Sequence, residues 1–86
     1  MARFDMGAAA EMATTASLDE TLFQMGIESS TRDGNPDLVS AHKWFNLAAM
    51  RGNPDAARYR QELALEMNAT EIAEAQRAAR EWIRTH

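Results

Sequence analysis

The sequence contains no cysteine, so neither a disulfide framework nor a metal site built on thiolates is possible. Small secreted domains with weak cores usually carry disulfides, and their absence here favours a reducing compartment. The longest run without a charged residue stays well short of the ~18 apolar residues that a membrane span needs. We therefore expect a chain without a membrane span, located in the cytoplasm.

The first residues, MARFDMGAAAEMATTAS, lack the continuous apolar core of a signal peptide, because Asp5 and Glu11 interrupt them. We expect residues 1–16 to form an N-terminal arm, flexible or partly helical. Residues 17–86 then form a single domain, because 86 residues suffice for one small core only.

Positive charge is also scarce, with 9 Lys and Arg against 13 Asp and Glu and a formal net charge of -4. Such a chain has no overall positive field to attract phosphates, so nucleic acid is not expected as a partner. The imbalance lies in residues 1–41, whereas residues 42–86 carry seven bases against six acids. The arginines of the second half are interpreted as solvated helix faces that pair with nearby glutamates.

Strand signals are missing, since β-branched residues are few and never alternate over a useful length. Helix signals are frequent, and they predict an all-α fold with helices at 18–31, 36–51, 54–67 and 69–84. The starts are marked by Ser17 with Glu20, by Asn35 before Pro36, by Asn53 before Pro54, and by Asn68 with Glu71. Gly52 is expected to end the second helix in the left-handed conformation.

Apolar residues recur at helical spacing behind each of these start signals, and they predict the faces that form the core. Two helices that meet across the short turn at Gly52 are expected to form an antiparallel hairpin. The inward positions are Leu18, Leu22, Phe23, Met25, Gly26, Ile27, then Leu38, Ala41, Phe45, Ala48, Ala49, then Ala56, Tyr59, Leu63, Met67, and finally Ile72, Ala75, Ala79, Trp82, Ile83.

One stretch carries small and aromatic residues at fixed intervals, in the pattern Ala-x-x-Trp-Phe-x-x-Ala-Ala-x-x-Gly-x-x-x-Ala. It resembles the signature half of a Sel-one-like repeat, a relative of the tetratricopeptide repeat. The preceding helix is similar to the other half of that repeat, so that the likeness covers residues 21–56. The signature positions are Met25, Gly26, Ala41, Trp44, Phe45, Ala48, Ala49, Gly52 and Ala56.

The chain departs from the family pattern at three points. Ser29 stands where the family usually has Tyr, and the loop after Gly34 is shorter than usual. In the register of a second repeat, Leu-Gly would stand at positions 60 and 61, but the sequence has Arg60 and Gln61 there. The third and fourth helices therefore resemble a terminal cap on stacked antiparallel helical hairpins.

The resemblance implies a protein–protein interaction module, an adaptor or small accessory subunit, with no cofactor and no chemistry of its own. Because repeats normally stack in threes or more, one repeat with a cap is expected to leave an apolar edge open. Another protein, a second copy of the chain or the N-terminal arm are the expected occupants. The possible contact residues are Phe4, Met6, Met12, Trp82 and Ile83.

Two other classes of function stay open, a self-associating structural protein and a small enzyme or ligand-binding regulator. The second class needs polar groups that point inward, and the apolar stripes contain almost none. We predict no catalytic, cofactor-binding or metal-binding residue and no small-molecule substrate. The residues interpreted as surface or capping groups are His42, His86 and the pairs Glu62/Glu66 and Glu71/Glu74. No nucleophile is predicted, because Ser17 and Ser40 have no base within local reach.

Overall fold

The structure, a computed structural model, describes residues 18–86, and every regular element in that range is a helix. The prediction of an all-α fold is thereby confirmed. The part of the first helix that the structure describes covers residues 18–30. It is followed by α2 (Leu38–Met50), α3 (Pro54–Ala64) and α4 (Ala69–Thr85). The predicted arm with Phe4, Met6 and Met12, and the predicted cap Ser17, lie outside the described residues.

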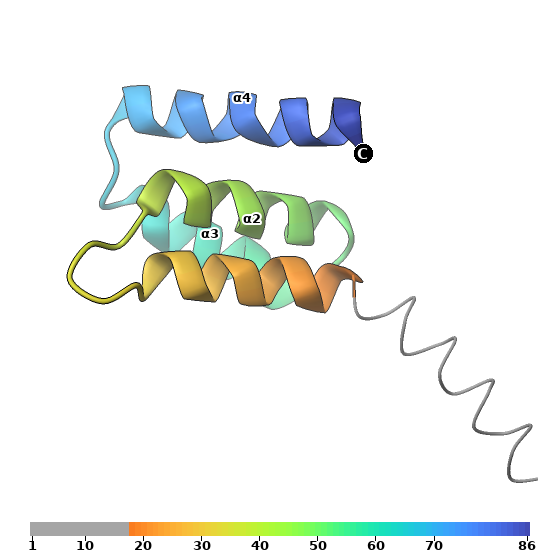
Figure 1. Ribbon diagram of the computed structural model, residues 1–86, viewed down its shortest axis with the longest axis horizontal. Coiled ribbons are helices and arrows are strands. Elements are labelled where there is room, and N and C mark those ends of the chain that lie inside the picture. The colour runs from red at the N-terminus through yellow and green to blue at the C-terminus, as the bar shows by residue number, and fades with distance from the viewer. Residues whose placement is uncertain (1–17) are drawn as a thin grey trace, which may run out of the picture.

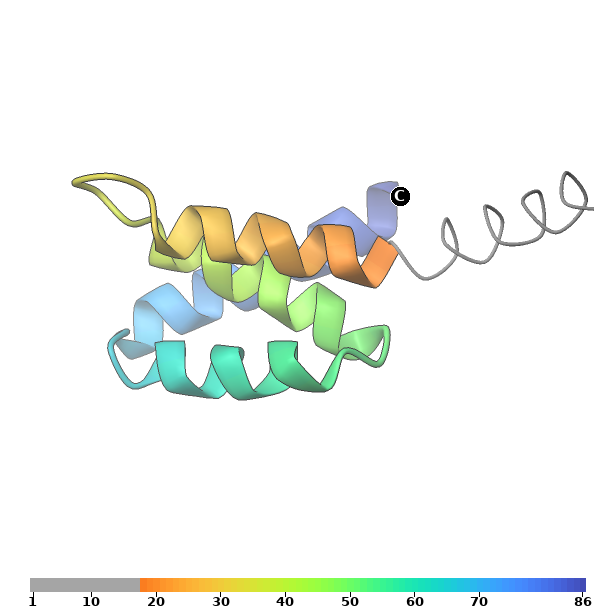
Figure 2. The same cartoon turned by 90° about the horizontal axis from the view of Figure 1, so that it is seen from below.

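Helix α2 is the centre of the fold. Figure 1 shows it between the first helix and α4, with α3 behind, and Figure 2 shows it between the first helix and α3. Phe23 of the first helix joins two of these neighbours, with its ring 5.6 Å from that of Phe45 in α2 and 5.3 Å from that of Tyr59 in α3. Trp44 of α2 meets Trp82 of α4 edge to face at 6.3 Å. Aromatic contacts therefore join α2 to α4, and the first helix to both α2 and α3.

Helix α2 begins two residues later than the sequence predicts. Asp37, not Asn35, is its N-cap: Oδ1 accepts the backbone N–H of Ser40 at 3.0 Å, and Oδ2 accepts the Ser40 hydroxyl at 2.9 Å. The backbone N–H of Asp37 also donates to the Ser29 carbonyl at 2.8 Å. This bond between loop and first helix holds Asp37 in extended backbone, so the helix cannot start before it.

The turn from α2 to α3 is as predicted. Gly52 has φ +96°, and its N–H donates to Ala49 at 2.9 Å while the N–H of Asn53 donates to Ala48 at 3.1 Å. These two bonds are the Schellman motif, in which backbone groups close the helix end. Asn53 then caps α3 by accepting the N–H of Ala56 at 2.9 Å. Figure 1 shows the resulting antiparallel pair.

Helix α3 ends at Ala64 and not at Met67. Three successive N–H groups, from Leu65 to Met67, donate to carbonyls three residues back, so the last turn is tightened. Met67 is nevertheless buried, as predicted. The predicted capping box that starts α4 is present, with Asn68 and Glu71 each accepting the other's backbone N–H.

The core confirms most of the predicted inward positions and corrects three. Leu47 is buried although it lies outside the predicted stripe, because α2 has helices on three sides. Leu18 and Ile83, predicted to point inward, are 39% and 45% exposed, and Ile83 lies in the last turn of α4. The buried cluster consists of Leu22, Ala41, Phe45, Leu47, Ala48, Ala56 and Ala79.

Gly26 explains how the first helix comes so close to α2. A Cβ at this position would lie 2.5 Å from Cε1 of Phe45, much closer than carbon atoms pack. The ring of Phe45 thus rests directly on the backbone of the first helix. A glycine is required here for close approach, although its φ is that of an ordinary helix.

Candidate functional site

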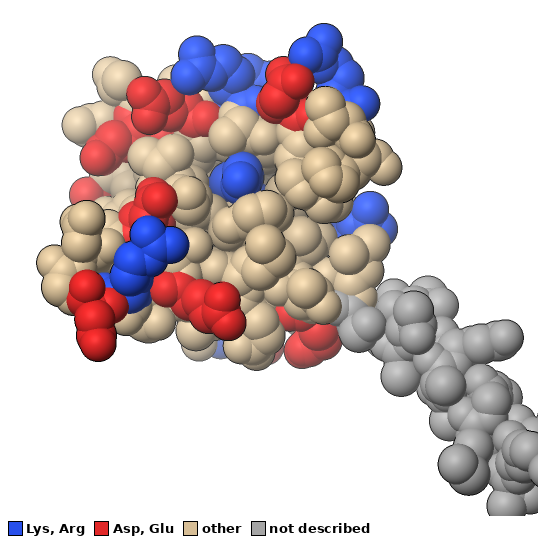
Figure 3. Space-filling model, in the orientation of Figure 1, with Lys and Arg blue, Asp and Glu red and all other residues tan. Residues whose placement is uncertain are grey.

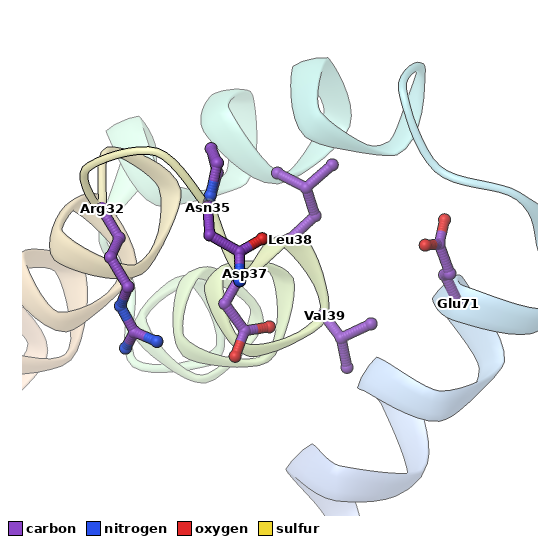
Figure 4. Close-up of a pocket in the computed structure, with 7 residues that line it drawn as sticks. Arg32, Asn35, Asp37, Leu38, Val39 and Glu71 are labelled. Carbon is purple, nitrogen blue, oxygen red and sulfur yellow. The ribbon is translucent and has the colours of Figure 1, made fainter.

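Two hollows lie at opposite ends of the pair formed by α2 and α4. The first, termed the pocket, encloses about 340 Å³ at the starts of the two helices. It is lined by Arg32, Asn35, Pro36, Asp37, Leu38, Val39 and Glu71 (Figure 4). The second, termed the groove, encloses about 310 Å³ at their ends and is lined by Leu47, Met50, Arg51, Trp82 and Ile83.

The carboxylates of the pocket are both occupied with helix capping. The backbone N–H of Ser40 holds the pKa of Asp37 below its usual value, against the effect of burial, and the Ser40 hydroxyl and the nearby charges of Arg32 and Lys43 add to this. Asp37 is therefore ionised at neutral pH and has no proton to donate. Glu71, which approaches from α4 in Figure 4, accepts the backbone N–H of Asn68 at 2.9 Å.

The groove is apolar and open to solvent. Leu47 forms its buried floor, and the side chains of Met50 and Ile83 stand at its mouth, 62% and 45% exposed. Trp82 forms a wall and is only partly buried. Because Met50 and Ile83 come from the last turns of two different helices, their juxtaposition depends on the packing of α4 against α2.

Two aromatic side chains contact the ring of Trp82 in the groove. Trp44 meets its ring edge to face at 6.3 Å, and His86 stacks on it with ring centroids 4.5 Å apart and an angle of 6° between planes. The imidazole Nδ1 of His86 also lies 3.0 Å from the Trp82 carbonyl oxygen. A large aromatic group with few accessible rotamers loses little entropy on binding, which suits a contact residue.

Arg51 is the one charged residue among those that line the groove. Near the end of α4, Arg84 is paired with Glu81 at 2.8 Å, and both side chains are exposed. Figure 3 shows the same distribution on a larger scale: basic and acidic side chains line the α4 edge, while much of the centre of this face is uncharged. The arrangement is an apolar surface with a polar border.

The predicted signature residues come together in the packed interior and not in either hollow. Ala41, Phe45, Ala48 and Ala56 are buried. Gly26 is buried beneath Phe45, and Gly52 is exposed at its turn. The remaining three, Met25, Trp44 and Ala49, are half-buried.

Of the predicted contact residues, the structure describes Trp82 and Ile83, and both line the groove. Leu47, Met50 and Arg51, which complete it, were not predicted. The available signal was weak, because Met50 precedes the predicted helix stop and resembles one more residue of a buried stripe.

Among the helices within residues 18–86, none combines the length and the apolar character that a membrane span requires.

His42 was interpreted as a surface residue, and this is wrong. It is only 4% exposed, and its Nδ1 is buried without a hydrogen-bond partner. Burial lowers the pKa of its imidazole, and the positive charge of Arg60 lowers it further. The spacing of His42, Phe45 and Ala49, at i, i+3 and i+7, was the signal that indicated an inward face.

The other titratable candidates show no assembled site. Glu62, Glu66 and Glu74 are exposed, and Glu71 is used as a cap. Within residues 18–86 no group of three or more His, Asp or Glu side chains is placed to hold a metal ion. The Ser40 hydroxyl donates to the carboxylate of Asp37, which is the cap of its own helix.

A scan of protein-family models found no match to the chain, and searches of curated proteins and of solved structures found none either. The resemblance to Sel-one-like repeats therefore stays a prediction based on the signature positions.

Proposed function

We propose that this protein is a protein–protein interaction module, an adaptor or small accessory subunit of a larger assembly, and that the groove is its binding surface. The observation that carries the proposal is the pair of large apolar side chains, Met50 and Ile83, exposed at the mouth of an apolar groove. Most other large apolar side chains of residues 18–86 are at least half-buried.

The composition of the groove favours a protein partner over a small polar ligand. Trp, Met and Arg are the residue types enriched at protein interfaces, and binding energy concentrates on a few such residues at the centre. Trp82 supplies the rigid aromatic, Met50 the adaptable apolar group and Arg51 the charged rim. A small polar molecule needs several polar side chains to fix its orientation, and Arg51 is the one polar side chain among the residues that line the groove.

The repeat resemblance supports the same function by a separate route. The first helix and α2 occupy the place of the repeat, and α3 and α4 follow as its cap. A terminal cap needs a polar outer face, and exposed Glu62, Glu74 and Arg77 supply one. Proteins of this family act as adaptors, and we extend that role to this chain as part of the proposal, with the cytoplasm as its expected compartment.

The test combines capture with a binary binding measurement. The full chain, tagged at its C-terminus, is used to capture proteins from lysate of the source cells, beside a variant with Met50→Gln and Ile83→Gln. Leu65→Gln is the matched control, because Leu65 is 87% exposed and lies at the end of α3, away from the groove. The captured protein is then purified, and its dissociation constant for each variant is measured by calorimetry.

We expect the unmodified chain and the Leu65→Gln variant to bind with equal affinity. The double variant is expected to lose at least about 2 kcal/mol of binding free energy, as at central contact residues. Equal binding by the double variant would exclude the groove as the site. If only the chain itself is recovered and its sedimentation coefficient rises with concentration, the self-associating alternative replaces the adaptor.

A further inference from the structure

Three chain segments meet at the groove end of the molecule. The start of the described first helix, the end of α2 and the end of α4 all lie at this end in both Figure 1 and Figure 2. Of the four exposed large apolar residues in the part of the chain that the structure describes, Leu18, Met50 and Ile83 belong to these segments and Leu65 does not. The exposed apolar surface of residues 18–86 is thus concentrated where residues 1–17 join the domain.

The seventeen residues that precede Leu18 are long enough to reach the groove. Met12 is six residues from Leu18, which in extended chain spans about 20 Å. Packed helices have axes only about 8–10 Å apart, so the groove lies within two helix diameters of the attachment point. Phe4 and Met6 lie further along the chain and have correspondingly greater reach.

The same residues match the groove in chemistry. Asp5 stands between Phe4 and Met6, and Glu11 directly precedes Met12, so each acid is next to a bulky apolar side chain. The groove pairs an apolar floor with the cation Arg51 at its rim. A segment attached to the domain also has an effective concentration of the order of mM. A second copy of the chain lacks this advantage at ordinary concentrations.

We propose that residues 1–17 of this chain occupy the groove, with Phe4 and Met6 or Met12 on its apolar floor and the adjacent acid directed at Arg51. Occupancy by the chain's own segment is an intramolecular contact and does not depend on the proposed function. Its consequence, that the segment competes with a partner, rests on the proposed function of the groove.

The absence of cysteine makes a direct test simple, because a single introduced thiol can be labelled without background. The full chain with Ala9→Cys carries a nitroxide, and paramagnetic broadening is read at the methyl groups of Met50 and Ile83 and at the indole N–H of Trp82. We expect these three signals to lose most of their intensity, and the Leu65 methyl signals to be affected least. Uniformly sharp signals would overturn the proposal.

A mixing experiment separates the chain's own segment from that of a second copy. Spin-labelled chain without isotopes is mixed with isotope-labelled chain that carries no nitroxide, and the same signals are recorded. We expect no broadening in the mixture, because the contact is intramolecular. Broadening there as strong as in the singly labelled sample would show that a second copy is the occupant and would overturn the proposal.

Two variants of the full chain test the contact residues. With Phe4→Ala, Met6→Ala and Met12→Ala, we expect the Trp82 indole signal to recover its intensity, as it also should with Met50→Gln and Ile83→Gln. Persistent broadening in either variant would contradict the assigned contacts.

The triple variant also tests competition in the binary assay with the captured partner. We expect its dissociation constant to fall, by about tenfold if the segment occupies the groove nine-tenths of the time. An unchanged constant would refute competition. The spin-label experiment needs no partner, so failure of the contact and failure of the proposed function are distinguished.

Discussion

The pocket and the groove lie at opposite ends of the same two helices, and they differ because helices begin and end differently. At the starts, side chains satisfy the unpaired backbone N–H groups: Asp37 serves α2, and Asn68 with Glu71 serves α4. The end of α2 is closed by backbone bonds at Gly52, so the side chains of its last turn have no capping role. The carboxylates of Asp37 and Glu71 at the pocket are therefore used for capping, while the apolar side chains of Met50 and Ile83 at the groove are exposed to solvent.

The largest expected effect comes from the packing that both ends share. Gly26→Leu forces the ring of Phe45 to move, and overpacking of this kind costs about 3 kcal/mol of unfolding free energy at the upper end of its usual range. Urea denaturation measures the loss, and Gln24→Leu, on the exposed face of the same helix, is the control. Hydrogen exchange should show that amides at both ends lose protection together; loss at one end alone would show that the ends unfold independently.

A comparison of two asparagine caps sharpens the contrast between the ends. Asn53 is only 9% exposed, and besides capping α3 its side-chain amide donates to Asp19 of the first helix at 3.2 Å. Asn68 caps α4 at the exposed pocket end. We expect Asn53→Ala to cost about 2 kcal/mol and Asn68→Ala about 1 kcal/mol, because only the first variant also loses a part-buried hydrogen bond to another helix.

Thermal denaturation of the two cap variants measures this difference. Asn53→Asp keeps the acceptor that caps α3 but removes the donor and places a second carboxylate beside Asp19. It should therefore be as destabilising as Asn53→Ala. Equal stability of Asn53→Asp and the unmodified chain would show that the bond to Asp19 contributes nothing.

Acid is expected to weaken the pocket half of α2, which holds both Asp37 and His42. Burial lowers the pKa of His42 in the folded state. As pH falls below 6.5, the imidazole of His42 is therefore protonated in the unfolded chain while it stays neutral in the folded chain. Stability is then lost with falling pH, by at most about 1.4 kcal/mol per pH unit. Asp37, with its folded pKa lowered from 3.8, adds a further loss at still lower pH.

Unfolding free energies measured between pH 7.5 and 5 test this effect. His42→Leu removes the buried imidazole, and its stability should vary less with pH over that range. His86→Gln, at an exposed position, is the control. A His42→Leu variant with the same pH slope as the unmodified chain would show that His42 is not the group responsible.

The smallest effect on stability is expected at the groove itself. Met50→Gln and Ile83→Gln change side chains that are already exposed, so together they should alter the unfolding free energy by less than about 0.5 kcal/mol. Circular dichroism during thermal denaturation measures this. A large loss would mean that the two side chains support the packing of α4 against α2, which would remove the argument that they are available for binding.

Local signals in the sequence were sufficient to predict the helices but not all of their ends. Gly52, Asn53 and the Asn68–Glu71 pair act within a few residues of themselves, and each has its predicted role. The start of α2 was misplaced because a bond from Asp37 back to Ser29, eight residues away, selects between two possible caps. The pattern of neighbouring residues does not predict a hydrogen bond between the loop and the preceding helix.

The candidate site was predictable only in part, for the same reason. Trp82 and Ile83 were proposed as contact residues from their place near the end of the chain, but Met50 joins them only because α4 lies against α2. His42 was misread although its helical spacing from Phe45 and Ala49 indicated an inward face, and the helices packed around α2 bury it to 4% exposure.

The sequence by itself determined the all-α fold and the short turn at Gly52, because capping, backbone conformation and helical periodicity are local properties. The tertiary structure decided which faces of α2 are covered, which polar side chains are committed to caps and loops, and where apolar side chains remain exposed. Those outcomes depend on contacts between residues distant in sequence, such as Trp44 with Trp82 and Gly26 with Phe45. Only the folded chain brings such residues together.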